Sequence, residues 1–330
     1  MPHSVPERRG RLATAIRRWV PVHLAILATA YAAIWIVKEP NVAAVMELWF
    51  FAPIGVFGAI IANATGTGGG VVFVPAFNAI GGGAIQLQMD IAELIRITPD
   101  NTVGMSFVIQ CFGMSIGTLV WLTNFFAGGK IPHDERITSQ AFFGIAFAVL
   151  CTTIPSLLIT QQFNPFSGPQ LLGAFKIFSI ILGVTLLVFS LKHDRFAPKN
   201  HRLDPAAVDY WALIGIGVIG GAVTALFSVG VGEFLAIYLI LRRFPTTAAI
   251  AIAVVVSVIT VFSGVWFHVA RDSVIWEIVV LAIPGAMFGG FIAKIIALKL
   301  GAQRLKILAS FWIILSSLYL IFGPSVELMP

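Results

Sequence analysis

Glycines and hydroxyl side chains gather in one stretch of the sequence, NATGTGGGVVFVP, which extends from Asn63 to Pro75. Glycine permits positive φ and a close approach of the backbone, so successive N–H groups can converge on an anion at a helix N-terminus. Threonine hydroxyls can donate further hydrogen bonds to the same anion. We therefore interpret this stretch as a binding site for a small oxyanion, and its predicted residues are Asn63, Thr65, Gly66, Thr67, Gly68, Gly69 and Gly70.

The second half of the chain carries a similar stretch, SVGVGE, at residues 228–233. Its predicted binding residues are Ser228, Gly230 and Gly232. Gln110 lies on the helix that should follow the first stretch, and we add it to the predicted site. If the two glycine-rich stretches meet, a small anion is the ligand that fits them.

The composition indicates that these stretches lie in a membrane. Of 330 residues, 58% are hydrophobic and 11% are charged, and the mean hydropathy is +0.94, which is too apolar for a water-soluble domain. Several runs approach or exceed the ~20 residues that a spanning helix needs. These runs are 22–37, 103–126, 141–160, 171–191, 248–269, 274–297 and 305–322.

Glu233 directly follows the second glycine-rich stretch and is the most informative charge in the chain. Burying a carboxylate inside a membrane costs free energy, so such a residue usually has a function. We interpret Glu233 as a proton carrier that couples anion movement to the proton gradient. The alternative is a structural cap or salt bridge at the N-terminus of the next short helix, where a carboxylate is favoured. An ionised Glu233 would also repel an anionic substrate unless it were protonated.

The distribution of Lys and Arg predicts the topology. With the basic N-terminus placed in the cytoplasm, the basic clusters at 192–202, 242–243 and 299–306 should also be inside. Counting spans back from the first of these clusters places residues 81–98 outside. The chain from 47 to 80 then starts and finishes on one side. A re-entrant hairpin satisfies this constraint, because the glycines divide the segment into pieces of roughly 15 and 10 residues, each too short to span.

The second half repeats the pattern from the opposite side, with a hairpin that ends at Arg242 and Arg243. Three full helices are expected after each hairpin. Opposed repeats of this kind are typical of secondary transporters. The predicted fold is an all-α polytopic membrane protein built from an inverted repeat, each unit a re-entrant helical hairpin plus three transmembrane helices, after one extra N-terminal transmembrane helix. The predicted divisions are a basic tail with the first helix (1–47), repeat 1 (48–191), a cytoplasmic linker (192–209), repeat 2 (210–322) and a tail (323–330).

Tight packing without a ligand is the alternative interpretation of the two glycine-rich breaks, although two breaks at symmetric positions favour a site. The Gly-x-x-x-Gly pattern at Gly285–Gly289 is a different case, and we interpret it as close helix packing. A nucleotide site is not expected at these glycines, since no βαβ unit surrounds them.

Three segments resemble the sulfite exporter TauE/SafE-type membrane transporters. GTGGGVVFVPAF (66–77) is similar to the family signature GxGGGxxxxP, and SVGVGEFLAIYL (228–239) is similar to a second copy 162 residues further along. PGAMFGGFIAK (284–294) resembles the glycine-spaced penultimate helix of the family. The resemblance covers residues 48–322 and implies export or uptake of small sulfur-containing or organic anions. The second copy departs from the signature at Ser228, Val231 and Ile237.

The predicted function is a secondary transporter that moves sulfite, a sulfonate or a sulfoacetate-like anion by alternating access, coupled to a proton or cation. Another small inorganic anion or a carboxylate is an open alternative, and a non-transporting membrane assembly factor is a weaker one. An enzyme is not expected, because the six histidines are scattered and show no HExxH spacing.

The predicted location is a bacterial-type inner membrane, with the N-terminus cytoplasmic and the C-terminus outside. The predicted partners are the small anion, the coupling ion and the lipid bilayer, and a homo-oligomer is left open. Nucleic acid is not expected, because a cytoplasmic bias of Lys and Arg explains the net charge of +6. No cofactor or metal is expected, since the two cysteines lack metal-ligand spacing.

Overall fold

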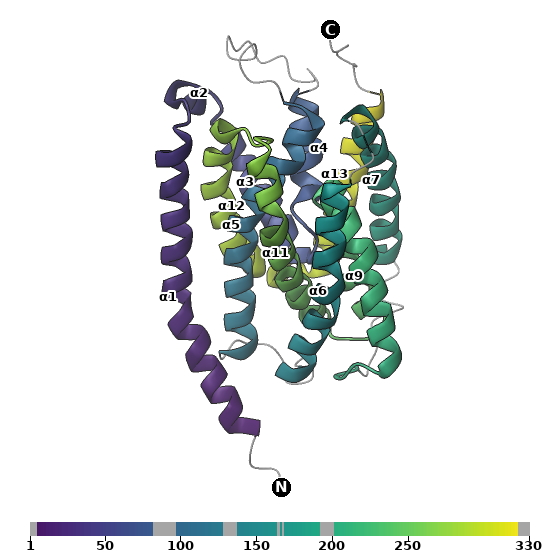
Figure 1. The fold of residues 1–330 in the computed structure, drawn as a ribbon. Helices are drawn as coiled ribbons and strands as arrows, with labels where there is room; N and C mark the ends of the chain where they lie inside the picture. The colour runs from purple at the N-terminus through teal and green to yellow at the C-terminus, as the bar shows by residue number, and fades with distance from the viewer. Residues whose placement is uncertain are drawn as a thin grey trace.

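The structure, a computed structural model, describes residues 5–81, 97–127, 137–163, 166, 168–191 and 201–322. All secondary structure within these ranges is helical, and the helices form one bundle (Figure 1). The predicted outer segment 81–98, the linker 192–209 and the tail 323–330 fall wholly or partly outside the described residues. The helices are α1 (Val5–Lys38), α2 (Val42–Glu47), α3 (Phe51–Thr65), α4 (Gly70–Gly81), α5 (Pro99–Phe126), α6 (Ser139–Gln162), α7 (Gly168–Leu191), α9 (Ala207–Phe227), α10 (Val231–Leu241), α11 (Thr246–Ala270), α12 (Trp276–Leu300) and α13 (Ala302–Phe322).

The helix lengths confirm a polytopic membrane protein. In the described part of the chain, eight helices are long and apolar enough to cross a membrane, and α3, α4 and α10 are shorter apolar helices. The sequence predicts seven spans, and the additional one is α9. The predicted second repeat starts at residue 210, but α9 starts at Ala207. It starts earlier because the Asp209 carboxylate accepts the N–H of Ala206 (2.7 Å) and so caps the helix N-terminus.

The N-terminal region is more helical than predicted. A basic tail was expected before the first apolar run at 22–37, yet α1 begins at Val5 and its apolar part begins at Leu12. This helix lies at the edge of the bundle (Figure 1), so few of its side chains are buried. The short helix α2 follows it and was not predicted. Its N-terminus is capped by Asn41, whose side-chain oxygen accepts two backbone N–H groups.

Helices α3 and α12 cross closely because glycines line their contact. A Cβ added to Gly285 would overlap the carbonyl oxygen of Ala52, and one added to Gly289 would overlap that of Val56. In the opposite direction, Gly55 on α3 leaves no room for a Cβ against α12. This contact supports the interpretation of the Gly-x-x-x-Gly pattern as a packing device.

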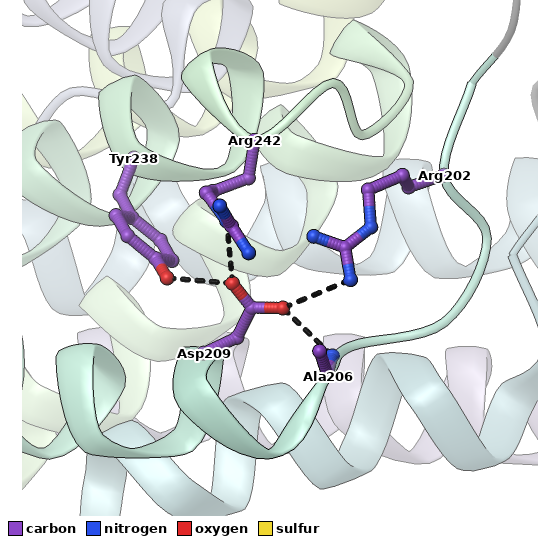
Figure 2. A network of polar contacts seen from close by, with 5 residues as sticks. All are labelled: Arg202, Ala206, Asp209, Tyr238 and Arg242. Atoms are coloured by element: carbon purple, nitrogen blue, oxygen red, sulfur yellow. Dashed lines mark hydrogen bonds and ion pairs between the residues drawn. The ribbon is translucent and has the colours of Figure 1, made fainter.

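Asp209 ties together the open end of the α9–α10 hairpin (Figure 2). Its buried carboxylate accepts hydrogen bonds from the Tyr238 hydroxyl (2.7 Å) and from Arg242 Nε (2.6 Å), both near the end of α10. Arg202 forms an ion pair with the other carboxylate oxygen (3.3 Å). Asp209 therefore fixes the two arms of this hairpin to each other and to the segment that precedes α9.

We expect Asp209→Ala to lower the free energy of unfolding by about 2 kcal/mol, because it removes hydrogen bonds to a buried charged group while both arginine partners keep access to solvent. Equilibrium unfolding in mixed detergent micelles measures this difference. Asp204 lies in the same segment but is exposed, so Asp204→Ala is the matched control. Equal stability of the two variants would contradict a structural role for the Asp209 cluster.

Candidate anion-binding site at the hairpin tips

Both hairpins turn through a left-handed residue at the end of their first arm. Gly66 ends α3 with φ 78° and ψ 8°, and Ser228 ends α9 with φ 60° and ψ 20°. We call residues 66–69 the first tip and residues 228–230 the second tip. A left-handed conformation is uncommon for a serine and persists only where the surroundings hold it. Gln110 Nε2 holds Ser228 by donating to its hydroxyl (2.7 Å) and to its carbonyl oxygen (3.3 Å).

The two tips contact each other through a reciprocal pair of glycines. A Cβ on Gly70, the first residue of α4, would overlap the carbonyl oxygen of Ser228. A Cβ on Gly232, in the first turn of α10, would lie 2.6 Å from the carbonyl oxygen of Gly66. Each glycine thus allows its short helix to begin directly against the opposite tip. The N-termini of α4 and α10 are thereby brought to one place, where their dipoles favour negative charge.

The side chain of Glu233 supplies that negative charge. One carboxylate oxygen accepts the N–H of Gly68 in the first tip (2.8 Å), and the other accepts the N–H of Gly230 in the second tip (2.9 Å). Glu233 is only 1% exposed. It therefore does cap α10, as one of the two interpretations expected, and it also bridges to the other hairpin in the manner of a bound oxyanion. Its role as a proton carrier stays a prediction.

Helix α5 holds both tips through Gln110. Its Oε1 accepts the N–H of Gly69 (2.7 Å), while its Nε2 donates to Ser228 and also lies 3.0 Å from Ser106 Oγ. The Ser228 hydroxyl in turn donates to Ser106 Oγ (2.9 Å). Ser106 is not among the predicted site residues. Its spacing of four residues from Gln110, which places both on one helix face, was the available signal.

A cavity of only about 10 Å³ remains between the tips. That is close to the minimum needed for one water molecule, so this conformation is closed around Glu233. Among the predicted residues, those that line the cavity are Gly68, Gln110, Ser228, Gly230, Gly232 and Glu233. Gly69 contacts the same network through Gln110, Gly70 through Ser228, and Gly66 through its carbonyl oxygen.

The other three predicted residues do not line this cavity. The Thr65 hydroxyl donates to the Ile61 carbonyl oxygen (2.7 Å), and the Thr67 hydroxyl pairs with that of Thr65 (2.7 Å). Asn63 Nδ2 donates to one carbonyl oxygen of α3 (2.8 Å) and to one of α5 (3.3 Å). In this conformation the two threonine hydroxyls bond at the end of α3, while Asn63 links α3 to α5 and its Oδ1 has no hydrogen-bond partner among the described residues.

Two further polar residues, Thr224 and Ser257, line the cavity and were not predicted. Thr224 Oγ1 accepts the N–H of Val231 (3.2 Å), and the buried hydroxyl of Ser257 has no hydrogen-bond partner in the part of the chain that the structure describes. Ser257 stands eleven residues beyond the start of α11, as Gln110 stands eleven beyond the start of α5. This shared position was the signal that could have placed Ser257 in the site.

Comparisons with known proteins identify the family of this chain. The model of the sulfite exporter TauE/SafE family matches residues 51–320. A relative described as "probable membrane transporter protein YunE", from Bacillus subtilis (strain 168), is 24% identical over 283 residues, which cover 82% of this chain and 95% of the relative. No solved structure matches the chain significantly. Since the family match extends over far more than half of the sequence, the chain belongs to the sulfite exporter TauE/SafE family of membrane transporters.

Proposed function

We propose that this protein is a secondary transporter of a small sulfur-containing or organic anion, such as sulfite, a sulfonate or sulfoacetate, across the inner membrane. The observation that carries the proposal is the Glu233 carboxylate, which takes one N–H from each hairpin tip as a bound oxyanion would. A carboxylate substrate is the second candidate, because a carboxylate is the group that the tips hold here. Family membership supports transport rather than catalysis.

Glu233 and the substrate would compete for the same donors. Two like charges ~4 Å apart repel by about 4 kcal/mol at an effective dielectric constant of about 20, so an anion cannot bind beside an ionised Glu233 without a large loss of affinity. A proton on Glu233 removes this repulsion and weakens its hold on Gly68 and Gly230. No other side chain that lines the small cavity, among the described residues, is ionisable. We therefore propose a proton as the coupling ion, so that the proton and the anion each strengthen the binding of the other.

Transport by alternating access follows from an inverted repeat of residues 48–191 and 210–322. Supporting this repeat, Gly66 and Gly70 correspond to Ser228 and Gly232 at a constant offset, with matching left-handed turns and matching close contacts. Helix α3 runs to the first tip from the end of the bundle where α2 lies. Helix α9 runs to the second tip from the opposite end (Figure 1). Movement of one repeat against the other would expose the tips to each side of the membrane in turn. The arginines around Asp209 support a cytoplasmic position for the second hairpin's open end, because Lys and Arg are enriched on the cytoplasmic side of membrane proteins.

Transport by the purified protein in proteoliposomes tests the proposal. We expect uptake of radiolabelled sulfite, or of another anion in a panel of sulfonates, carboxylates and inorganic anions, and we expect an acidic exterior to accelerate it. In detergent, the transported anion at one hundred times its Kd should stabilise the protein by ~2.7 kcal/mol. Absence of both uptake and stabilisation across the panel would rule out the proposed function, and uptake that ignores the pH gradient would rule out proton coupling.

A further inference from the structure

A second and much larger cavity, of about 320 Å³, lies at the end of the bundle where α6 and α11 finish. A volume of this size suits a small organic ligand. Ala225 and Leu226, just before the second tip, form part of its lining. Phe107 on α5 lies between the cavity and Gln110 along the helix, and its buried ring packs against His268, a residue that lines the cavity (centroid distance 4.8 Å). The cavity is therefore adjacent to the tips but separated from them by buried aromatic side chains.

Arg271 provides positive charge at this cavity. It is exposed, and its guanidinium group lies over the ring of Phe267 at 4.4 Å from the centroid. Within the described ranges it forms no ion pair with an acidic side chain. A guanidinium group held flat on an aromatic ring keeps its hydrogen-bond donors available at its edge, where they match the oxygens of a carboxylate or sulfonate.

Gln161 provides an unsatisfied acceptor in the same cavity. The side chain is 3% exposed, and its Nε2 donates to the carbonyl oxygen of Gly264 (3.1 Å), which fixes the orientation of the amide. Its Oε1 has no hydrogen-bond partner in the described part of the chain. A buried acceptor without a partner is costly, so a ligand that brings a donor gains by satisfying it. Asp100 also lines the cavity, and its carboxylate favours a donor and disfavours a second acidic group.

We infer that this cavity is a vestibule that binds a small organic acid carrying a hydroxyl or amino group, before the acid moves to the hairpin tips. The acidic group binds Arg271 and the donor binds Gln161, while the apolar body packs against Phe267 and Leu226. This inference rests on the proposed function, since it supplies the transported anion with its first binding site. It also specifies the substrate class, because an anion without a hydrogen-bond donor, such as sulfate, satisfies Arg271 but leaves Gln161 without a donor.

Calorimetric titration of the full chain in detergent with 2-hydroxyethanesulfonate and with ethanesulfonate tests the vestibule directly. We expect the hydroxylated acid to bind about tenfold more tightly to the wild type. Arg271→Gln should weaken both acids at least tenfold, and Arg271→Lys should weaken them less because it keeps the charge and loses the bidentate geometry. Gln161→Leu should leave ethanesulfonate binding unchanged and abolish the preference for the hydroxyl group. Lys38→Gln, which removes a cation outside the cavity, is the control and should bind as the wild type does.

The outcomes separate the vestibule from the proposed function. Wild-type affinities in Arg271→Gln, an unchanged hydroxyl preference in Gln161→Leu, or no binding of either acid to the wild type would overturn the vestibule, whether or not the protein transports other anions. Arg271-dependent binding without transport of any anion would overturn the proposed function and leave the vestibule standing. In proteoliposomes, Arg271→Gln should raise the KM for uptake of the hydroxylated acid tenfold with an unchanged maximum rate, because Arg271 lies away from the tips.

Discussion

Replacing Glu233 with glutamine should abolish anion transport driven by a pH gradient while anion exchange across the membrane continues. A glutamine side chain has one oxygen and one NH₂ group, so it can accept the N–H of Gly68 or of Gly230 but not both. One backbone donor is released to the substrate, and the repulsion between two anions disappears. The ionised carboxylate of Glu233 competes with the substrate through hydrogen bonds that contribute about 1.5–3 kcal/mol. Its removal should strengthen anion binding tenfold to hundredfold at neutral pH.

The pH dependence of binding has a definite sign. In the wild type, affinity for the anion should rise as the pH falls, since protonation of Glu233 removes the competitor. In Glu233→Gln the affinity should be high and independent of pH. Binding titrations across a pH series, together with gradient-driven uptake and counterflow exchange in proteoliposomes, measure these effects. Glu277→Gln, which changes a carboxylate on α12 away from the tips, is the matched control. Gradient-driven uptake at the wild-type rate in Glu233→Gln would show that another group carries the proton.

Substituting alanine for Gly70 or Gly232 should disrupt the contact between the two hairpin tips and strongly reduce anion transport. The new Cβ at Gly70 overlaps the Ser228 carbonyl oxygen, and the one at Gly232 overlaps the Ser257 hydroxyl and lies 2.6 Å from the Gly66 carbonyl oxygen. Backbone atoms of the opposite hairpin cannot move aside as a flexible side chain can. Overpacking of about 1–3 kcal/mol should weaken anion binding by a factor of about 5 to about 150. Gly68→Ala should be milder, because its Cβ would lie 3.2 Å from the nearest atom.

Other glycines supply the controls for this prediction. Gly173→Ala and Gly215→Ala place a Cβ where no atom lies within 4 Å, so both variants should keep stability and transport, and alanine is the better helix former. Gly285→Ala should lower the stability through the α3–α12 crossing and leave the anion affinity of the folded protein nearly unchanged. Thermal unfolding and ligand titration on the same samples separate the two effects. If Gly70→Ala and Gly173→Ala bound the anion equally well, the tips would be a packing device and the site would lie elsewhere.

The sequence by itself determined the solvent, the helices and the two breaks. A bilayer offers no water to unpaired backbone groups, so long apolar runs must be helical. For the same reason, glycine-rich interruptions must lie where other parts of the protein can bond their backbone groups. Both requirements act within about twenty residues of chain and can be recognised locally. The same local reasoning identified Glu233, since a carboxylate beside a helix break in a membrane is energetically costly unless it has a function or a hydrogen-bonding partner. The family signature at residues 66–77 depends on this local pattern too.

The tertiary structure alone decided which polar groups face which partners. The threonine hydroxyls near the first break bond within their own hairpin, whereas the N–H of Gly68 is taken by Glu233, 165 residues away in sequence. A hydroxyl or an N–H group can donate to any acceptor that lies within about 3 Å. The local sequence does not determine which acceptor the fold brings to that distance. The vestibule depends even more on the tertiary structure. Gln161 lies at the end of α6 and Arg271 at the end of α11, and neither residue is part of a sequence motif. These two residues meet only because the long helices pack against each other in a particular way, and no spacing of residues along the chain encodes that packing.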